Sequence, residues 1–114
     1  MAKKIVETFT ATVAVGTKHT ATDMIQLTDN AIAWLQEYVD KVGLCVTVTR
    51  TEYIYSKGRE PGLLIGLINY PRFPASKEDI KNHAMVIAES LKEKLRQKRV
   101  SIICSDETIT IGEL

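Results

Sequence analysis

The most constraining feature of this sequence is an apolar run, Leu63–Asn69, in which both alternating faces carry leucine or isoleucine. Such a run is typical of a central strand that is covered on both sides of a sheet. The link before it, Ser56–Gly62, contains two glycines and a proline and therefore predicts a turn. The loop after it, Tyr70–Pro74, contains two prolines, each following an aromatic residue, which stiffen it and bias it away from helix.

Period-two alternation of β-branched and other apolar residues predicts the other strands. These are Lys4–Val15, Leu44–Tyr55, Val100–Cys104 and a short one at Thr108–Ile111. Arg50 and Glu52 interrupt the apolar face of the second strand, which favours an edge position for its second half.

Two segments instead repeat apolar residues at intervals of three and four, which indicates amphipathic helices. The first runs from about Thr22 to Val42, with Thr22 or Asp23 as its cap and Gly43 as its end. The second begins after Ser76, where Ser76 and Asp79 have capping-box spacing, and its apolar residues extend to Leu95.

The element order is therefore β-α-β-β-α-β with a short extra C-terminal strand. This order is typical of the ferredoxin-like α+β sandwich, in which two helices cover one face of an antiparallel sheet. The first and third strands are then central, and the second and fourth lie at the edges. We expect a single α+β domain that spans residues 1–114.

Composition excludes several classes of protein. The chain has 15 basic and 14 acidic side chains, and this balance argues against a nucleic-acid partner. The third strand also lacks the aromatic residues with which RRM domains stack bases. No apolar run is long enough to cross a membrane, and the N-terminus does not resemble a signal peptide, so we expect a cytoplasmic protein. Cys45 and Cys104 lack metal-ligand spacing and predict two reduced thiols. We expect no cofactor and no metal.

The sheet face opposite the helices is predicted to carry many threonines, together with leucine or isoleucine from the third strand. A surface of this kind is too apolar for ready exposure, and we expect it to be buried in a homodimer or a higher homo-oligomer. The alternative is a solvated threonine ladder, which is common on antiparallel sheets.

No phosphate loop, dinucleotide fingerprint or catalytic triad is present. The sequence therefore favours a non-catalytic binding protein for a small anionic or nucleotide-like ligand. Arginines would neutralise the ligand's charge, and aromatic rings would stack on it. The candidate ligand-binding residues are Arg50, Tyr53, Tyr55, Arg59, Tyr70, Arg72 and Phe73; no catalytic residue is assigned.

Two alternatives belong to other functional classes. The first is a cofactor-free, ferredoxin-like dimeric enzyme of the oxygenase or isomerase type, with His83, Tyr53 and Arg72 in its active site. The second is an assembly or interaction protein, such as a small phage or accessory component, in which the open sheet face is the contact surface.

Overall fold

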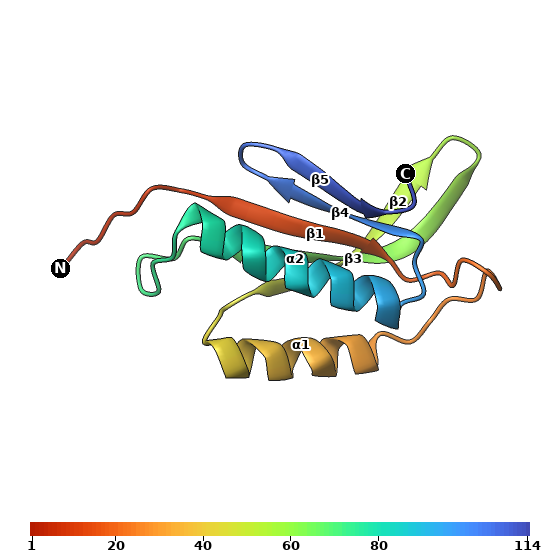
Figure 1. The fold of residues 1–114 in the computed structure, drawn as a ribbon, viewed down its shortest axis with the longest axis horizontal. Helices are drawn as coiled ribbons and strands as arrows, with labels where there is room; N and C mark the ends of the chain where they lie inside the picture. The colour runs from red at the N-terminus through yellow and green to blue at the C-terminus, as the bar shows by residue number, and fades with distance from the viewer.

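Five strands form one antiparallel sheet in the order β2-β3-β1-β4-β5 (Figure 1). The computed structural model describes all of residues 1–114. The strands are β1 (Thr10–Gly16), β2 (Thr47–Tyr55), β3 (Gly58–Ile68), β4 (Arg99–Cys104) and β5 (Thr108–Gly112), and the helices are α1 (Asp29–Val42) and α2 (Lys77–Lys94).

Both helices lie on one side of this sheet (Figure 1). The expected ferredoxin-like α+β arrangement is confirmed, and β2 forms one edge as predicted. The other edge is β5, which pairs with β4, so β4 is not an edge strand.

The core consists of one cluster of 18 buried residues between the sheet and the helices. Strand β1 contributes its alternate residues Ala11, Val13 and Val15, all of which are buried. Their register partners on β3, including Ile65 and Leu63, face the same side. Helix α2 covers them with Ile80, Ala84, Ile87 and Leu91, at the spacing of a single helical face. The apolar alternation therefore fixes which face of every strand points to the helices.

The first strand begins at Thr10, and the prediction that it starts at Lys4 is wrong. The pairing of β1 with β3 ends at Thr10 and Ile68, and its pairing with β4 ends at Ala11 and Cys104. The residues before Thr10 continue the alternating pattern but have no strand beside them. Strand propensity alone cannot supply hydrogen-bond partners for the backbone.

The first helix begins at Asp29, so the predicted start near Thr22 is also wrong. Residues 17–28 form a loop held by its own backbone bonds, including one from the Gln26 amide to the Thr17 carbonyl at 2.9 Å. Asp23 has a φ of 58° and does not cap a helix. Met24 and Leu27, which extended the apparent repeat, are exposed.

The second strand starts at Thr47, three residues later than predicted, and the third starts at Gly58, five residues earlier than predicted. Because β2 and β3 are joined by the two-residue turn Ser56–Lys57, most of the predicted link is paired in the sheet. Lys57 has a φ of 64°, which a tight hairpin turn requires.

Both helix-end predictions that depend on local chemistry are confirmed. Ser76 Oγ accepts a hydrogen bond from the Asp79 amide at 3.1 Å and caps α2. Gly43 ends α1 with a φ of 74°, a conformation that glycine adopts without a side-chain clash.

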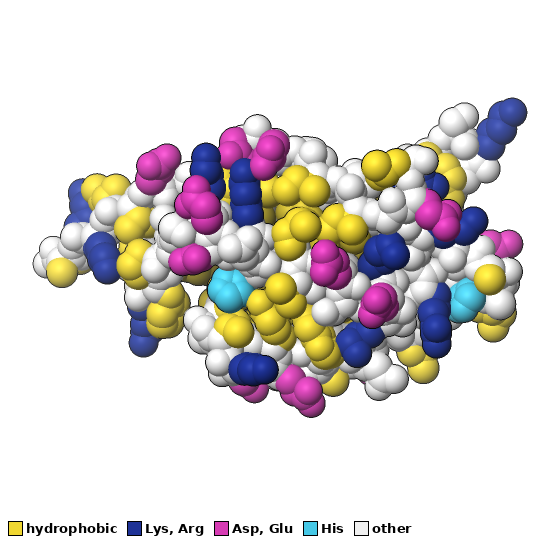
Figure 2. Space-filling model, viewed as in Figure 1, with side chains coloured by type: hydrophobic (Ala, Val, Ile, Leu, Met, Phe, Trp, Pro, Cys, Tyr) yellow, Lys and Arg dark blue, Asp and Glu magenta, His cyan; other side chains and the backbone are white.

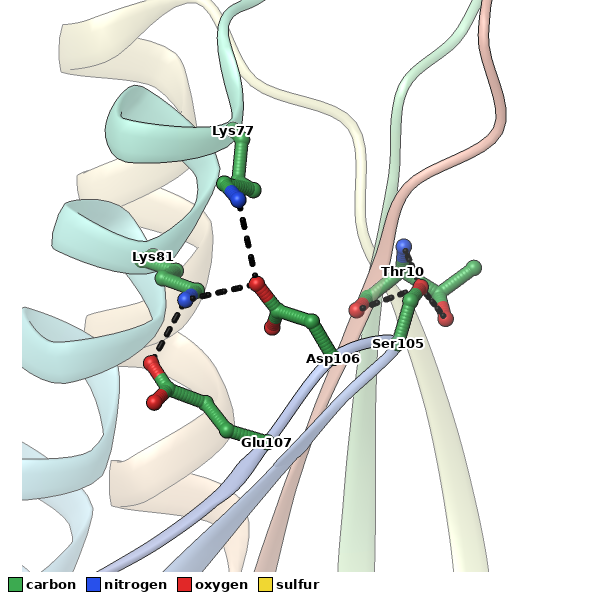
Figure 3. Close-up of polar contacts among 6 residues, drawn as sticks. All are labelled: Thr10, Lys77, Lys81, Ser105, Asp106 and Glu107. Carbon is green, nitrogen blue, oxygen red and sulfur yellow. Dashed lines mark hydrogen bonds and ion pairs between the residues drawn. The ribbon is translucent and has the colours of Figure 1, made fainter.

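Two lysines of α2 hold the turn between β4 and β5 (Figure 3). The Asp106 carboxylate lies 3.2 Å from Lys77 Nζ and 3.1 Å from Lys81 Nζ, and Lys81 also contacts Glu107. On the other side of the turn, Ser105 Oγ accepts a hydrogen bond from the Thr10 amide at 2.8 Å. The extra hairpin is thereby fastened to both α2 and β1.

Acidic and basic side chains are interspersed on the face of the molecule shown in Figure 2, without a patch of one sign. Neither helix combines the length and the hydropathy that a membrane crossing requires. Cys45 and Cys104 are both free thiols.

Candidate functional site

The largest hollow of the molecule, a cavity of about 570 Å³, is lined by residues of the open sheet face and by the segment between α2 and β4. Tyr53 and Tyr55 of β2 line one side of it, and Arg99 and Ser101 of β4 line the other. Gly16, at the end of β1, lies on its floor. The volume is within the range of about 300–1,000 Å³ that is usual for small-molecule sites.

Two hydrogen-bond acceptors converge on Gly16. A Cβ atom at this position would lie 2.7 Å from Glu60 Oε1 and 2.9 Å from Gln97 Oε1. Any side chain at position 16 would therefore displace one or both of these groups. We call this cavity, with its floor at Gly16, the Gly16 pocket.

The orientation of Gln97 is fixed by its own amide group. Gln97 Nε2 donates to the carbonyls of Lys18 and Leu95, each at 2.7 Å. Its Oε1 is consequently the end near Gly16. The preceding residue, Arg96, has a φ of 53°, and its carbonyl accepts a hydrogen bond from Thr20 Oγ1 at 2.8 Å. The sharp turn at the end of α2 thus places Gln97 at the pocket.

Two tyrosine rings lie directly on glycines of β3, where a Cβ atom would collide with them. The Tyr53 ring lies against Gly62, and the Tyr55 ring lies against Gly58. The Tyr53 hydroxyl donates to the Leu63 carbonyl at 3.2 Å, which fixes that ring. Burial raises the pKa of Tyr53 above its ordinary value, and the nearby charge of Glu60 raises it further. Tyr53 therefore stays a neutral hydrogen-bonding group at physiological pH.

The charges at the pocket are not compensated by ion pairs within the chain. Glu60 is half-buried, and neither it nor Lys98 and Arg99, which also line the pocket, belongs to any ion pair. One carboxylate near the floor and two cations elsewhere on the wall suit a ligand that carries both a positive and a negative group. No group of three or more His, Cys, Asp or Glu residues is arranged to hold a metal ion.

Of the seven candidate ligand-binding residues predicted from the sequence, the structure brings only Tyr53 and Tyr55 together at this pocket. Arg50 pairs in register with the buried Leu63 and so lies on the opposite face, where its Nη1 donates to Thr28 Oγ1 at 3.0 Å. Arg59 is also on that face, with its Nε 3.7 Å from a carboxylate oxygen of Glu52.

Tyr70, Arg72 and Phe73 lie beyond the far end of β3, away from the Gly16 pocket. The Arg72 guanidinium lies 5.4 Å from the centre of the Phe73 ring. His83, a candidate for the enzyme alternative, has its Nδ1 2.7 Å from the Tyr38 hydroxyl. We expected the edge strand to converge with the Ser56–Gly62 link and the Tyr70–Pro74 loop. This convergence does not occur, because the two segments lie at opposite ends of β3.

The sequence did not single out Gly16, Glu60 or Gln97, which form the floor of the pocket. Glu60 and Gln97 are separated by a complete helix, and no spacing rule relates them. The available signal was the run of glycines at alternate positions of one face of β3, since glycine within a strand often marks a close approach of another group.

No protein-family model matches the chain, and no curated protein sequence matches it. Two solved structures share its fold. One is a phage SAM lyase in the apo state, with a TM-score of 0.74 and 16% identity over 92% of this chain and 89% of that one. The other is a phage SAM lyase in complex with S-methyl-5′-thioadenosine, with a TM-score of 0.71 and 16% identity over 99% of this chain and 95% of that one.

These neighbours contradict our main functional expectation, a non-catalytic binding protein, because both are enzymes. They agree better with the enzyme alternative. The second neighbour binds a small ligand, which is compatible with a small-molecule partner for this fold.

Proposed function

We propose that this chain is an enzyme that cleaves SAM (S-adenosylmethionine) in the Gly16 pocket and releases S-methyl-5′-thioadenosine. The observation that carries the proposal is the unpaired, half-buried carboxylate of Glu60 beside two tyrosine rings in the largest cavity, on a fold shared with phage SAM lyases. Shared fold alone does not define an activity, so the argument rests on the match between pocket and substrate.

SAM carries a sulfonium and an ammonium, both positive, and a carboxylate. Glu60 Oε1 and Gln97 Oε1 are acceptors and suit the positive part of such a molecule. Lys98 and Arg99 suit its carboxylate. The outer face of the Tyr55 ring, half of whose surface is exposed, offers a platform for an adenine base or for the sulfonium itself.

The proposed reaction breaks the bond between the sulfonium sulfur and the methylene carbon of the four-carbon amino acid chain. The bonding electrons go to sulfur, which becomes the neutral thioether of S-methyl-5′-thioadenosine and needs no proton to leave. As the carbon–sulfur bond breaks, a carboxylate oxygen of the same four-carbon fragment donates an electron pair to the methylene carbon. The new carbon–oxygen bond closes a five-membered lactone, so that no water is consumed and no proton is released. The chain's own residues bind and orient the substrate for this step.

Glu60 also provides a means of product release. It attracts the substrate through a positive charge that the thioether product lacks, so binding weakens once the bond is broken. This difference in attraction between substrate and product is larger in the half-buried pocket than in bulk water, because solvent screens the charge of Glu60 less there.

Formation of S-methyl-5′-thioadenosine from SAM, followed by liquid chromatography, tests the proposal. We expect turnover by the wild type and a loss of about 10- to 100-fold in kcat/KM in Glu60→Gln, the usual effect of removing one charge-assisted contact. Glu52→Gln removes a carboxylate that pairs with Arg59 on the other face and should leave turnover unchanged. Equal activity in Glu60→Gln and the wild type, or no thioether product from the wild type, would refute the assignment.

We also propose that the chain self-associates through its open sheet face and acts in the cytoplasm. Ile68 and Ile103 on this face are 39% and 49% exposed. Ile68 pairs with Thr10 on one side of β1, and Ile103 pairs with Thr12 on the other side. Burying such side chains against another copy is favourable. Two free thiols suit a reducing compartment.

A further inference from the structure

The Tyr70–Pro74 loop, which the proposed function does not use, forms one wall of a second cleft. This cleft has a volume of about 190 Å³, and 9 of its 13 lining residues are hydrophobic. It lies between the end of α1, the end of β3 and the start of α2. Its apolar walls include Leu44, Leu67, Ile68, Pro74 and Ile80. The Gly16 pocket lies at the other end of β3 and shares no lining residue with it.

The loop wall is held in place by the backbone. The Phe73 amide donates to the Tyr70 carbonyl at 3.0 Å, and the Ala75 amide donates to Asn69 Oδ1 at 3.0 Å. The Phe73 side chain is 55% exposed, so it does not plug the core. Instead, one part of the ring borders the cleft while the Arg72 guanidinium lies over it. A preformed wall of this kind lowers the entropic cost of binding a ligand.

Polar groups also line this largely apolar space: the side chains of Asp79 and His83, together with the thiol of Cys45 and the hydroxyl of Tyr70, two residues that are counted among the nine hydrophobic ones. The Cys45 thiol lies beside the Tyr70 hydroxyl and is the main cause of a raised pKa of that tyrosine. The His83 ring is oriented by its contact with Tyr38. The Asp79 carboxylate belongs to no ion pair.

We propose that this cleft is a second ligand site, which takes a single aromatic ring that carries a hydroxyl or amino group. The size sets the first part of this assignment, because an apolar cavity of about 150 Å³ is known to take benzene. The polar groups set the second part, because a few fixed donors and acceptors in an apolar site orient a ligand that has a polar substituent. Since the two cavities lie at opposite ends of β3, both can be occupied at once.

Titration of the full chain with phenol, followed by the amide signals in a ¹⁵N NMR spectrum, tests this site. We expect saturable shifts at Cys45, Tyr70 and His83 with a dissociation constant in the millimolar range, as for other fragments of this size. Cys45→Phe fills the cleft from its exposed rim and should weaken binding by about tenfold or more, and Phe73→Ala should weaken it by removing the wall. Val86→Ala, at an exposed position of α2 outside the cleft, should have no effect.

Phenol binding should also persist in Glu60→Gln, which separates this site from the proposed SAM site. The proposal is overturned if phenol shifts no signals, if it shifts those of Tyr53 and Gln97 instead, or if Cys45→Phe and Phe73→Ala bind phenol as the wild type does. Shifts at the cleft that depend on protein concentration and not on phenol would also overturn it, because the occupant would then be a second copy of the chain.

Discussion

Gly16 is the position where a single methyl group should matter most. Its backbone has no positive φ, so alanine is tolerated there, but the added Cβ would lie within 2.9 Å of both Glu60 Oε1 and Gln97 Oε1. We expect Gly16→Ala to weaken binding of S-methyl-5′-thioadenosine by about tenfold or more and to change the free energy of unfolding by no more than about 1 kcal/mol. Titration calorimetry and urea unfolding measure the two quantities.

Gly66 provides the matched control on the same sheet face. A Cβ atom there would lie 2.5 Å from Thr47 Oγ1, which is likewise the end of a side chain. Gly66 does not line the Gly16 pocket, so Gly66→Ala should leave ligand affinity unchanged. If the two variants lose affinity equally, the effect comes from the strands as a whole and the role of the Gly16 floor is refuted.

The β4–β5 hairpin is the element whose attachment depends most on charge. Lys81, by hydrogen bonding, and Lys77 hold the pKa of Asp106 below its ordinary value of 3.8. A carboxyl group whose pKa is lower in the folded state contributes stability above the unfolded value and loses it as the pH falls through the folded value. The hairpin attachment should therefore weaken below about pH 4.

Urea unfolding of the wild type and Lys81→Met at a series of pH values tests this attachment. We expect Lys81→Met to be less stable than the wild type near neutral pH and the difference to shrink below about pH 4. Lys4→Met, which changes a lysine outside every ion pair, should follow the wild type throughout. A constant difference between Lys81→Met and the wild type at all pH values would exclude the carboxylates as its cause.

The elements also show what local sequence can and cannot predict. The ends of helices at Gly43 and Ser76 were predictable because each depends on one residue's own conformation or hydrogen bond. The beginnings of β1 and α1 were not, because Lys4–Phe9 lacks a partner strand and Met24 and Leu27 are not packed against the core. Periodicity indicates which conformation a segment can adopt, whereas its tertiary contacts determine at which residue the helix or strand begins.

At the scale of the whole molecule, the strand order and the buried face of the sheet followed from element order and alternation. The site did not, because Gly16 of β1, Glu60 of β3 and Gln97 of the segment between α2 and β4 meet only through the tertiary fold. Tyr53 and Tyr55 were found because aromatic residues on an edge strand stand out. Arg72 and Phe73 stood out equally but lie at the other end of β3.

The open sheet face is the surface through which we expect the chain to form an oligomer. Light scattering should give a mass of two or more chains for the wild type, because Ile68 and Ile103 would be shielded from water by association. Ile103→Lys should shift this equilibrium toward the single chain, since it places a charge in the contact. Val86→Lys, which changes a similarly exposed residue on α2, should not. A single-chain mass for the wild type at high concentration would contradict the proposed association.

The most direct test of the account is to locate S-methyl-5′-thioadenosine on the protein by ¹⁵N NMR. We predict saturable amide shifts centred on Gly16, Tyr53, Glu60 and Gln97, with none at Tyr70 on the far end of the sheet. Absence of shifts at saturating ligand, or shifts confined to the Tyr70–Pro74 loop, would contradict the claim that the Gly16 pocket is the site of this chemistry.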